Sequence, residues 1–441
     1  MKYVIIGNSY AGLSCADAIR RFDKSGEVVI VSDEKYRAYA RPLISYYLEG
    51  KTTDETIWYK DDDYYEKNNF QFLPGKKVVS VDTASKRVIT EDGENINYDK
   101  LFIGPGGTPF IPPTEGFNPD SPMMGTFTRF DDAKKMEKAA KIAKHKEAIV
   151  VGGGLIGLKA SEGLRGLGLH VTIVELLPRV LGLALDEMSG NITAKRLNEN
   201  GIDTATGETV TKINLDEAGN PTSVILKSGK ELIADIVVVG VGVRPNVGFL
   251  EGSGIKIDRG IVVDKTMMTS VQDVYAGGDA AVIYDVINKR PNIIAIVPLA
   301  CEEGRVAGTN MAGVYREYPG GMGLNSVEIY GLPIVTIGLT NPSNESQKVY
   351  IYQDEKVYRK LVYDDEVLVG AILLGDISGS GILSAIIRQG LKSLKYKDEF
   401  INGNIYSFVI DNEFEIYNIN EGYAIRGDFE DLPEFSRANW R

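Results

Sequence analysis

The chain has 441 residues, enough for about three domains of ~150 residues each, and its 43% hydrophobic and 25% charged residues are ordinary for a globular protein. The 61 Asp and Glu against 49 Lys and Arg give a formal net charge of −12, which argues against a nucleic-acid or anionic-membrane partner. Two cysteines (Cys15, Cys301) and two histidines (His145, His170) are too few for an iron–sulfur cluster or a Cys/His zinc site, so we expect no metal centre, and any redox chemistry must come from a bound organic cofactor.

The chain begins with a short apolar run, 3–6, followed at once by Gly7. A glycine turn at this point predicts a strand that meets a helix rather than a signal peptide. The longest other apolar stretches, 236–243 and 293–301, are shorter than the ~20 residues of a membrane-spanning helix. The two cysteines form no C-x-x-C motif and suit a reducing compartment. We therefore expect a cytoplasmic protein without a membrane partner.

An internal repeat is the most informative feature of the sequence. Residues 3–34 and 148–175 each contain a β-branched apolar run, a glycine-containing turn, a helical stretch and a second apolar run. This strand–turn–helix–strand order is typical of a dinucleotide-binding fold. One glycine makes the tight turn, one lets the backbone approach a pyrophosphate, and one lets the helix pack closely on the strand. The helix N-terminus then offers free N–H groups to the phosphates.

The first copy has the form G-x-S-x-x-G, with a serine in place of the middle glycine. Serine is small and can donate a hydrogen bond to a phosphate, so we expect the turn to bind a dinucleotide through four residues: Gly7, Ser9, Ala11 and Gly12. Ser32, Asp33 and Glu34 follow the second strand, and either Asp33 or Glu34 could accept hydrogen bonds from the adenosine ribose.

The second copy is a full G-x-G-x-x-G, and its expected cofactor-binding residues are Gly152, Gly154, Leu155, Ile156 and Gly157. Glu175 ends the next strand, where a carboxylate accepts hydrogen bonds from the ribose hydroxyls and repels a 2′-phosphate. NADH should therefore be preferred over NADPH, although Arg179, four residues later, could soften this preference.

The remaining predicted elements fall between and after the two copies. They are hairpin strands at 76–81 and 87–90, a basic solvated helix at 134–146, strands at 222–226 and 234–243, a turn at 244–246, strands at 335–339, 348–352, 358–363 and 367–374, and a helix at 381–394. A separate α+β domain is predicted to begin near 320–323.

Five further segments resemble one family, the pyridine nucleotide–disulfide oxidoreductases, over about residues 1–395. They are YARPL at 39–43, YDKLFIGPGGTP at 98–109, VGVRPN at 241–246, VYAGGDAA at 274–281 and IVPLACEEGRVAGTNMAG at 296–313. The first of these is similar to the NADH:rubredoxin reductase branch.

The resemblance implies an α/β fold with two Rossmann-like dinucleotide-binding domains and a C-terminal α+β interface domain. A discontinuous FAD-binding domain would comprise 1–112 and 245–318, an inserted NAD-binding domain 113–244, and the interface domain with its tail 319–441. It places Arg41 near the FAD phosphates, Asp279 on the ribityl chain, and the N-terminus of the helix at 298–300 towards the flavin pyrimidine. The cofactor-binding residues that it adds are Arg41, Pro42, Val78, Pro105, Gly106, Gly242, Gly278, Asp279, Pro298, Leu299 and Ala300.

The chain departs from the family pattern at several positions. Pro42 stands where relatives that reduce CoA-disulfide or peroxide carry a cysteine, and no C-x4-C pair is present, so we expect no disulfide reductase activity. Lys159 stands where many relatives carry a Glu, and Tyr46 where they carry its lysine partner. We hypothesise that Lys159 is the catalytic residue, near the isoalloxazine; the alternative is a helix lysine turned to solvent. Pro105 replaces a common Thr, and Cys301 is expected to fill the core.

The function implied is electron transfer from NADH through FAD to a small carrier protein such as rubredoxin. Three alternatives stay open: a peroxide-forming NADH oxidase, a flavoprotein electron-entry subunit of a larger complex, and a binding protein that uses FAD structurally. We expect a homodimer or a complex subunit, and no residue identifies the acceptor. The segment from Tyr396 to the end, rich in acids and aromatics, would cover the protein's own surface or a dimer mate, or else dock a partner.

Overall fold

The computed structural model describes residues 1–405, so most of the expected tail, 406–441, lies outside the described residues. The described chain divides into two compact units. The first comprises Met1–Asp285, Lys289–Gly321 and Ile329–Leu332; the second comprises Val286–Asn288, Met322–Glu328 and the chain from Pro333 onward.

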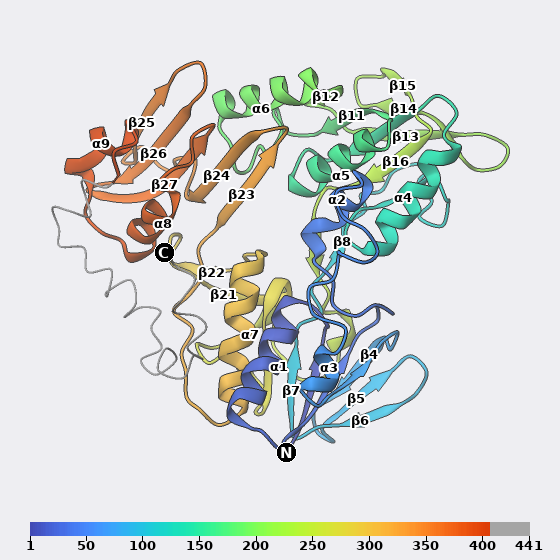
Figure 1. The fold of residues 1–441 in the computed structure, drawn as a ribbon, viewed down its shortest axis with the longest axis vertical. Coiled ribbons are helices and arrows are strands. Elements are labelled where there is room, and N and C mark those ends of the chain that lie inside the picture. Colours follow the sequence, from blue (N-terminus) through green and yellow to red (C-terminus); the bar gives the residue numbers. More distant parts are fainter. Residues whose placement is uncertain (406–441) are drawn as a thin grey trace. The chain divides into compact units, whose positions relative to one another are not determined.

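A five-stranded parallel sheet forms one half of the first unit, with the strand order β20-β7-β1-β2-β3. Its strands are β1 (Lys2–Ile6), β2 (Glu27–Val31), β3 (Phe70–Leu73), β7 (Lys100–Ile103) and β20 (Val274–Ala276). Helix α1 (Tyr10–Phe22) connects β1 to β2, and α7 (Val297–Met311) packs beside α1 (Figure 1). The strands are mostly apolar because both faces of the sheet are buried: Ile5 lies in the cluster on one side and Val4 in the cluster on the other.

A second parallel sheet repeats this architecture within the same unit, with the order β12-β11-β10-β16-β9. Its strands are β9 (Met124–Thr126), β10 (Glu147–Val151), β11 (His170–Glu175), β12 (Ile202–Thr206) and β16 (Ile236–Val239), and its helices are α4 (Phe130–Ile142), α5 (Leu155–Gly166) and α6 (Glu187–Glu199). The two Rossmann-like cores predicted from the internal repeat are therefore present.

Smaller elements complete the first unit. Its remaining strands are β4 (Val78–Asp82), β5 (Arg87–Thr90), β6 (Asn95–Asn97), β8 (Gly107–Pro109), β13 (Val210–Leu215), β14 (Pro221–Leu226), β15 (Glu231–Ile233), β17 (Val243–Pro245), β18 (Ile257–Asp258), β19 (Gly260–Val262), β21 (Ala281–Asp285) and β22 (Arg290–Asn292). Its short helices are α2 (Ile44–Leu48), α3 (Tyr64–Lys67) and the 3-10 turns η1 (Arg41–Leu43), η2 (Gly248–Leu250) and η3 (Gly278–Ala280).

The second unit contains most of a five-stranded sheet with the order β23-β24-β27-β26-β25. Its elements are β23 (Leu324–Ile329), β24 (Leu332–Gly338), β25 (Lys348–Gln353), β26 (Tyr358–Asp364), β27 (Val367–Leu374), α8 (Ser380–Gln389), η4 (Leu394–Tyr396) and α9 (Lys397–Ile401). Leu383 and Ile386 of α8 share a hydrophobic cluster with Leu361 of β26 and Leu373 of β27. The helix therefore covers one face of the sheet, as an α+β arrangement requires.

Several predicted elements differ from the structure; the strand predicted at 234–243, for example, is shorter at both ends. The basic helix predicted at 134–146 stops at Ile142, because Ala143 is extended and Lys146 adopts a positive φ of 61°. The helix predicted at 381–394 stops at Gln389, where Gly390 takes the left-handed conformation that ends helices. The turn predicted at 244–246 is largely strand, since β17 pairs with β8.

Within residues 1–405 no helix is both long and apolar enough to cross a membrane. Over the same range no group of three or more His, Cys, Asp or Glu is placed to hold a metal ion.

Candidate functional site

The first glycine turn lies between β1 and α1. Gly7 has a φ of +112°, its N–H donates to the Val31 carbonyl at 2.9 Å, and a Cβ on it would lie 2.0 Å from the Gly104 oxygen. A Cβ on Gly12 would lie 1.9 Å from the Gly7 oxygen. Neither position can hold a side chain, because its Cβ would overlap a backbone carbonyl oxygen. Glycine is therefore required at both positions.

The second glycine turn, between β10 and α5, has the same geometry. Gly152 has a φ of +109° and donates to the Val174 carbonyl at 2.8 Å, and a Cβ on Gly157 would lie 1.8 Å from the Gly152 oxygen. A Cβ on Gly154 would meet no atom within 4 Å, so open space lies before the first turn of α5. Leu155 is partly exposed there, while Ile156 lies close to Gly240.

Ser9 and Gly154 occupy equivalent positions, because each is the N-cap of its helix and each carbonyl accepts the N–H four residues on at 2.9 Å. The Ser9 hydroxyl makes no capping bond to its own helix. It therefore remains available to a ligand at the N-terminus of α1, where unpaired backbone N–H groups and the helix dipole favour an anion.

A third glycine segment closes each site. Gly104, Pro105 and Gly106 follow β7, and Gly240 and Gly242 follow β16 in the corresponding place. Gly106 and Gly242 have φ values of +70° and +112°, and a Cβ on either would meet nothing within 4 Å. Both sites thus have an open side lined by backbone, which suits close approach of a phosphate-bearing ligand.

The position of the ribose-binding acid differs between the two copies. Since Val31 and Val174 accept equivalent hydrogen bonds, Ser32 is the counterpart of Glu175. Glu175 lies at the mouth of the second turn, where its carboxylate accepts the Gly153 N–H and, at 2.7 Å, the Leu177 N–H. Ser32 instead accepts the Glu34 N–H at 3.2 Å. The acidic residues of the first copy are Asp33 and Glu34, which follow Ser32 by one and two positions.

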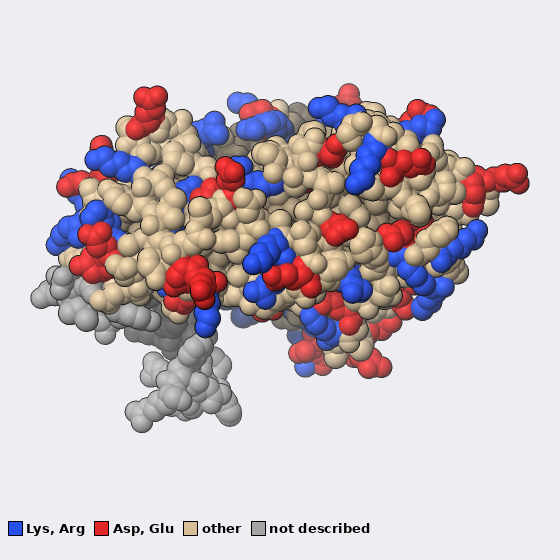
Figure 2. Space-filling view, turned by 90° about the horizontal axis from the view of Figure 1, so that it is seen from above, with Lys and Arg blue, Asp and Glu red and all other residues tan. Residues whose placement is uncertain are grey.

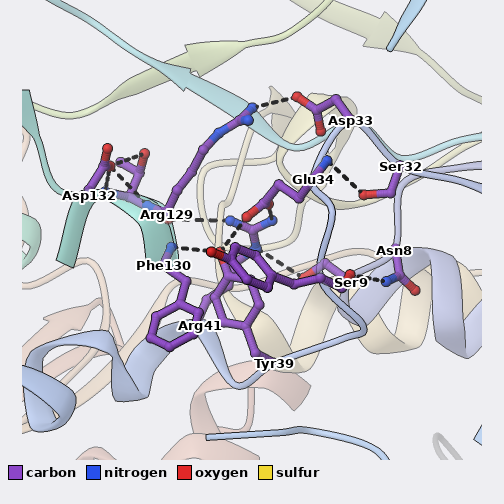
Figure 3. Close-up of polar contacts among 12 residues, drawn as sticks. Asn8, Ser9, Ser32, Asp33, Glu34, Tyr39, Arg41, Arg129, Phe130 and Asp132 are labelled. Carbon is purple, nitrogen blue, oxygen red and sulfur yellow. Dashed lines mark hydrogen bonds and ion pairs between the residues drawn. The ribbon is translucent and has the colours of Figure 1, made fainter. Parts of the chain in front are cut away.

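Figure 3 shows how the structure separates the two acids that the sequence left open. Asp33 pairs with Arg129 at 2.8 Å near the surface. Glu34 is nearly buried, forms an ion pair with Arg41, and accepts the Tyr39 hydroxyl at 2.8 Å. Burial and the Glu34 carboxylate raise the pKa of Tyr39, whereas Arg41 opposes the shift, so the phenol stays protonated and donates.

Arg41 connects this network to the glycine turn. Its Nε donates to the Ser9 hydroxyl at 3.3 Å and its Nη1 to the Thr128 carbonyl at 3.3 Å (Figure 3). The same guanidinium therefore touches the N-cap of α1 and the buried Glu34. Arg129 and Tyr39 belong to this network but were not predicted, because residues 128–130 reach it through contacts about ninety positions apart in sequence.

The segment around Asp279 lies at the same end of the first sheet. Gly278 has a φ of +74°, and a Cβ on it would lie 3.2 Å from Ala11 and 3.8 Å from Ala300. The structure thus brings Gly278 together with the first turns of α1 and α7. Leu299 is buried with Ala300, whereas Pro298, in the first turn of α7, is exposed. Burial raises the pKa of Asp279, and the positive charge of Arg41 opposes the shift.

Pro42 and Val78 are less closely tied to the turn. Pro42 lies exposed in η1, directly after Arg41. Val78 packs against the hydrophobic cluster that contains Ile6 and Val31, the last residues of β1 and β2.

Lys159 is held in an ion pair and is not turned to solvent. Its Nζ lies 2.6 Å from Glu162 Oε2 and 5.0 Å from the centre of the Tyr46 ring, with side-chain exposures of 22% for Lys159 and 6% for Glu162. Burial raises the pKa of Glu162, and Lys159 opposes that shift. Glu162 was not predicted as a site residue, although its i,i+3 spacing from Lys159 on α5 indicates a side-chain pair.

Cys301 is only partly buried, so the expectation that it fills the core is wrong. It lies near Tyr59, whose pKa is raised by burial first and by Cys301 among its neighbours.

These residues fit two dinucleotide ligands. Each site combines a glycine at a position where no side chain fits, an open helix N-terminus, and an acidic side chain at or just after the end of the next strand. Arg41 adds a permanent positive charge at the first site. Diphosphates and ribose hydroxyls are the groups that such donor sets bind.

Comparison with known families gives two matches. The model described as pyridine nucleotide-disulphide oxidoreductase matches residues 1–304, and that described as rubredoxin NAD+ reductase C-terminal domain matches residues 324–391.

Similar proteins carry different names. The chain is 30% identical to the NADH-dependent phenylglyoxylate dehydrogenase subunit epsilon of Aromatoleum evansii, over 91% of this chain and 94% of that protein. It is 32% identical to the NADH oxidase of Methanocaldococcus jannaschii, over 85% and 88%. The solved NADH:rubredoxin oxidoreductase of Clostridium acetobutylicum superposes with a TM-score of 0.74 at 26% identity, over 90% and 99%. The chain spans only 47% of the Bacillus subtilis nitrite reductase [NAD(P)H], to which it is 31% identical.

Proposed function

Since this chain belongs to the pyridine nucleotide-disulphide oxidoreductase family, we propose that it is an FAD-dependent oxidoreductase that takes electrons from NADH and passes them to a small carrier protein such as rubredoxin. When bound, FAD would supply the hydride-transfer and electron-transfer chemistry between NADH and the acceptor. The observation that carries the proposal is the pair of glycine turns, which share one backbone geometry and each open at a helix N-terminus. The chain's own residues would bind and orient the two dinucleotides and supply charge beside them.

The first turn is proposed to hold FAD. Ser9 and the N-terminus of α1 would receive the phosphates, with Arg41 adding its charge, while Glu34 rather than Asp33 would receive the adenosine ribose. This choice is supported by the burial of Glu34 beside Arg41 and by the pairing of Asp33 with Arg129 at the surface.

The second turn is proposed to hold NADH in preference to NADPH. Glu175 is oriented by two backbone N–H groups, so its negative charge is fixed beside the turn. Arg179 donates from Nε to the Leu185 carbonyl at 3.0 Å, and its stem packs against Gly190. Because the Arg179 side chain is held on Leu185 and Gly190, we propose that it does not draw a 2′-phosphate towards Glu175. This supports a preference for NADH.

Lys159 is proposed to supply positive charge to the reduced cofactor. Its support is the contact with Tyr46 of α2, which ties α5 to the segment that follows Arg41 and Pro42. Gly163 and Gly166 of α5 allow this close approach, since Cβ atoms there would lie 3.0 Å from Leu48 and 2.9 Å from Glu49.

The domain division into 1–112 with 245–318, 113–244 and 319–441 also stays a proposal, as do a cytoplasmic location and a homodimeric or complexed state. Light scattering of the purified chain would measure its assembly: a mass near twice 48.3 kDa supports a homodimer.

Two alternative functions are favoured by named relatives, an NADH oxidase and a subunit of a larger dehydrogenase. The face in Figure 2 intermixes acidic and basic side chains and offers no patch of one sign, so charge on that face does not select an acidic carrier. Anaerobic turnover of NADH with rubredoxin or an artificial dye, compared with oxygen uptake, separates the carrier reductase from the oxidase. With Pro42 in place of a thiol, the oxidase should release peroxide. Stoichiometric co-purification of partner chains identifies the subunit.

A further inference from the structure

A buried carboxyl lies close to the partly buried Asp279. Glu303, on α7, is only 2% exposed, and its Oε2 accepts the Gly278 N–H at 2.7 Å. Gly278 begins the η3 turn that carries Asp279. One hydrogen bond therefore ties this turn to α7.

The packing around Glu303 leaves it little freedom. A Cβ on Gly277 would lie 3.2 Å from the Glu303 Cβ and 3.2 Å from the Phe102 ring of β7. A Cβ on the next helix residue, Gly304, would lie 2.0 Å from the Ala11 oxygen of α1. Because α7 is pressed against α1 at this level, Glu303 cannot turn out to solvent without moving the helix.

The charged surroundings of Glu303 are acidic. The ionisable groups that act on it are Asp279 of η3 and Glu302 of its own helix, while β7 and α1 present apolar Phe102 and Ala11 near it. Among residues 1–405 no cation pairs with Glu303. Burial raises the pKa of Glu303 well above its usual range; the Gly278 N–H opposes this shift and the two acids add to it.

We propose that Glu303 is a positioning residue that, as a neutral carboxylic acid, holds the Gly278–Asp279 turn against α7 and leaves Asp279 the one carboxylate of the pair. That the ligand beside this turn is FAD rests on the proposed function. The two neighbouring carboxyls lie in different environments, so Glu303 keeps its proton while Asp279 carries a negative charge.

The proposal makes the turn sensitive to alkaline pH. Loss of the Glu303 proton to solvent creates a buried negative charge close to that of Asp279, and their repulsion pushes the turn off α7. An amide at this position still accepts the Gly278 N–H but cannot ionise.

The test compares the full-length wild type with Glu303→Gln, Glu303→Ala and, as a control at an exposed acid that does not act on Glu303, Glu251→Gln. The rate of FAD release is measured at about pH 6.5 and about pH 9. Wild type and Glu251→Gln should release FAD about tenfold faster at the higher pH. Glu303→Gln should release it less than about twofold faster, and Glu303→Ala should release it fast at both pH values. The same variants are unfolded thermally over the same pH range.

The unfolding series has a defined sign. Glu303 binds its proton more tightly when folded, so its contribution to stability is complete below the unfolded pKa near 4.5 and is lost as pH rises towards the folded value. The unfolding temperature of Glu303→Gln minus that of wild type should therefore grow with pH.

The outcomes separate this inference from the proposed function. A chain purified without flavin overturns the proposed function, whereas the unfolding series still tests the proton on Glu303. Equal pH dependence of wild type and Glu303→Gln in both measurements, or loss of FAD from Glu303→Gln at every pH, would overturn the inference.

Discussion

Glu175 and Ser32 illustrate how a single residue distinguishes two sites with the same backbone. Both follow a valine that accepts the hydrogen bond of the first glycine, yet only Glu175 carries a charge. The glycine motif predicted both turns and Glu175, because these residues are close in sequence and their spacing is set by backbone geometry. At the first site the charge comes from Glu34, whose partners Arg41 and Tyr39 fix it.

Replacing Glu175 tests coenzyme choice. Glu175→Gln removes the negative charge but keeps acceptors for the ribose, so the ratio of kcat/KM for NADH over NADPH should fall about tenfold. Steady-state kinetics with both coenzymes measure this ratio. Glu199→Gln, at the end of α6, serves as control and should leave it unchanged. A ratio unaffected by Glu175→Gln would show that this carboxylate does not discriminate.

Lys159 can be tested apart from its structural role. Lys159→Met leaves the Glu162 carboxylate buried and unpaired, so unfolding should become easier by about 1–3 kcal/mol. The double variant Lys159→Met with Glu162→Gln should recover most of that stability. If Lys159 supplies charge to the reduced cofactor, the double variant should still show a lower flavin potential and slower reduction by NADH. Wild-type potential and rate in the double variant would limit Lys159 to a structural role.

The side chains that the sequence did not reveal are the partners of predicted residues. Glu162 and Glu303 lie within segments used for the prediction, but at positions to which those patterns assign no role. Arg129 lies outside these segments and meets Asp33 from 96 positions away. Their roles depend on which strands and helices pack together. The choice between Asp33 and Glu34 likewise required the structure.

At the scale of elements, α1 and α7 bring the two parts of the first site together. Gly304 and Gly308 of α7 face the Ala11 and Cys15 carbonyls of α1, where Cβ atoms would lie only 2.0 and 2.3 Å from the oxygens. The close contact places the first turns of both helices beside Gly278.

Gly304→Ala should separate these helices. The added methyl overlaps the Ala11 carbonyl, so stability should fall by about 1–3 kcal/mol and FAD should be retained less tightly. Gly381→Ala, in α8, adds the same methyl where nothing lies within 4 Å and should leave both properties unchanged. Thermal unfolding and flavin release measure the two effects. A fully stable, fully yellow Gly304→Ala protein would contradict the role of this contact.

Element types were predictable where the periodicity was strong, whereas element ends depended on local conformation. β27 matches its predicted range of 367–374, since an unbroken apolar run marks a buried strand. Helix α8 ends at Gln389, five residues before the predicted end, because Gly390 takes the left-handed conformation. β17 was missed because three residues carry too little pattern, and its pairing with β8 is long-range.

At the scale of the whole molecule, the account depends on two dinucleotides that bind one chain. The first unit contains both glycine turns, and the second forms a sheet with its own hydrophobic cluster. The proposed roles of the tail fall on residues outside 1–405. The choice of electron acceptor depends on the protein surface and not on a sequence motif. Turnover measurements with candidate acceptors are therefore needed to identify it.

The most direct test of the central claim is an anaerobic titration of the purified chain with NADH while its visible absorption is recorded. The account predicts a yellow protein whose flavin band is bleached by about one NADH per chain. A colourless protein that takes up no FAD, or a flavin band that NADH leaves unchanged, would contradict it.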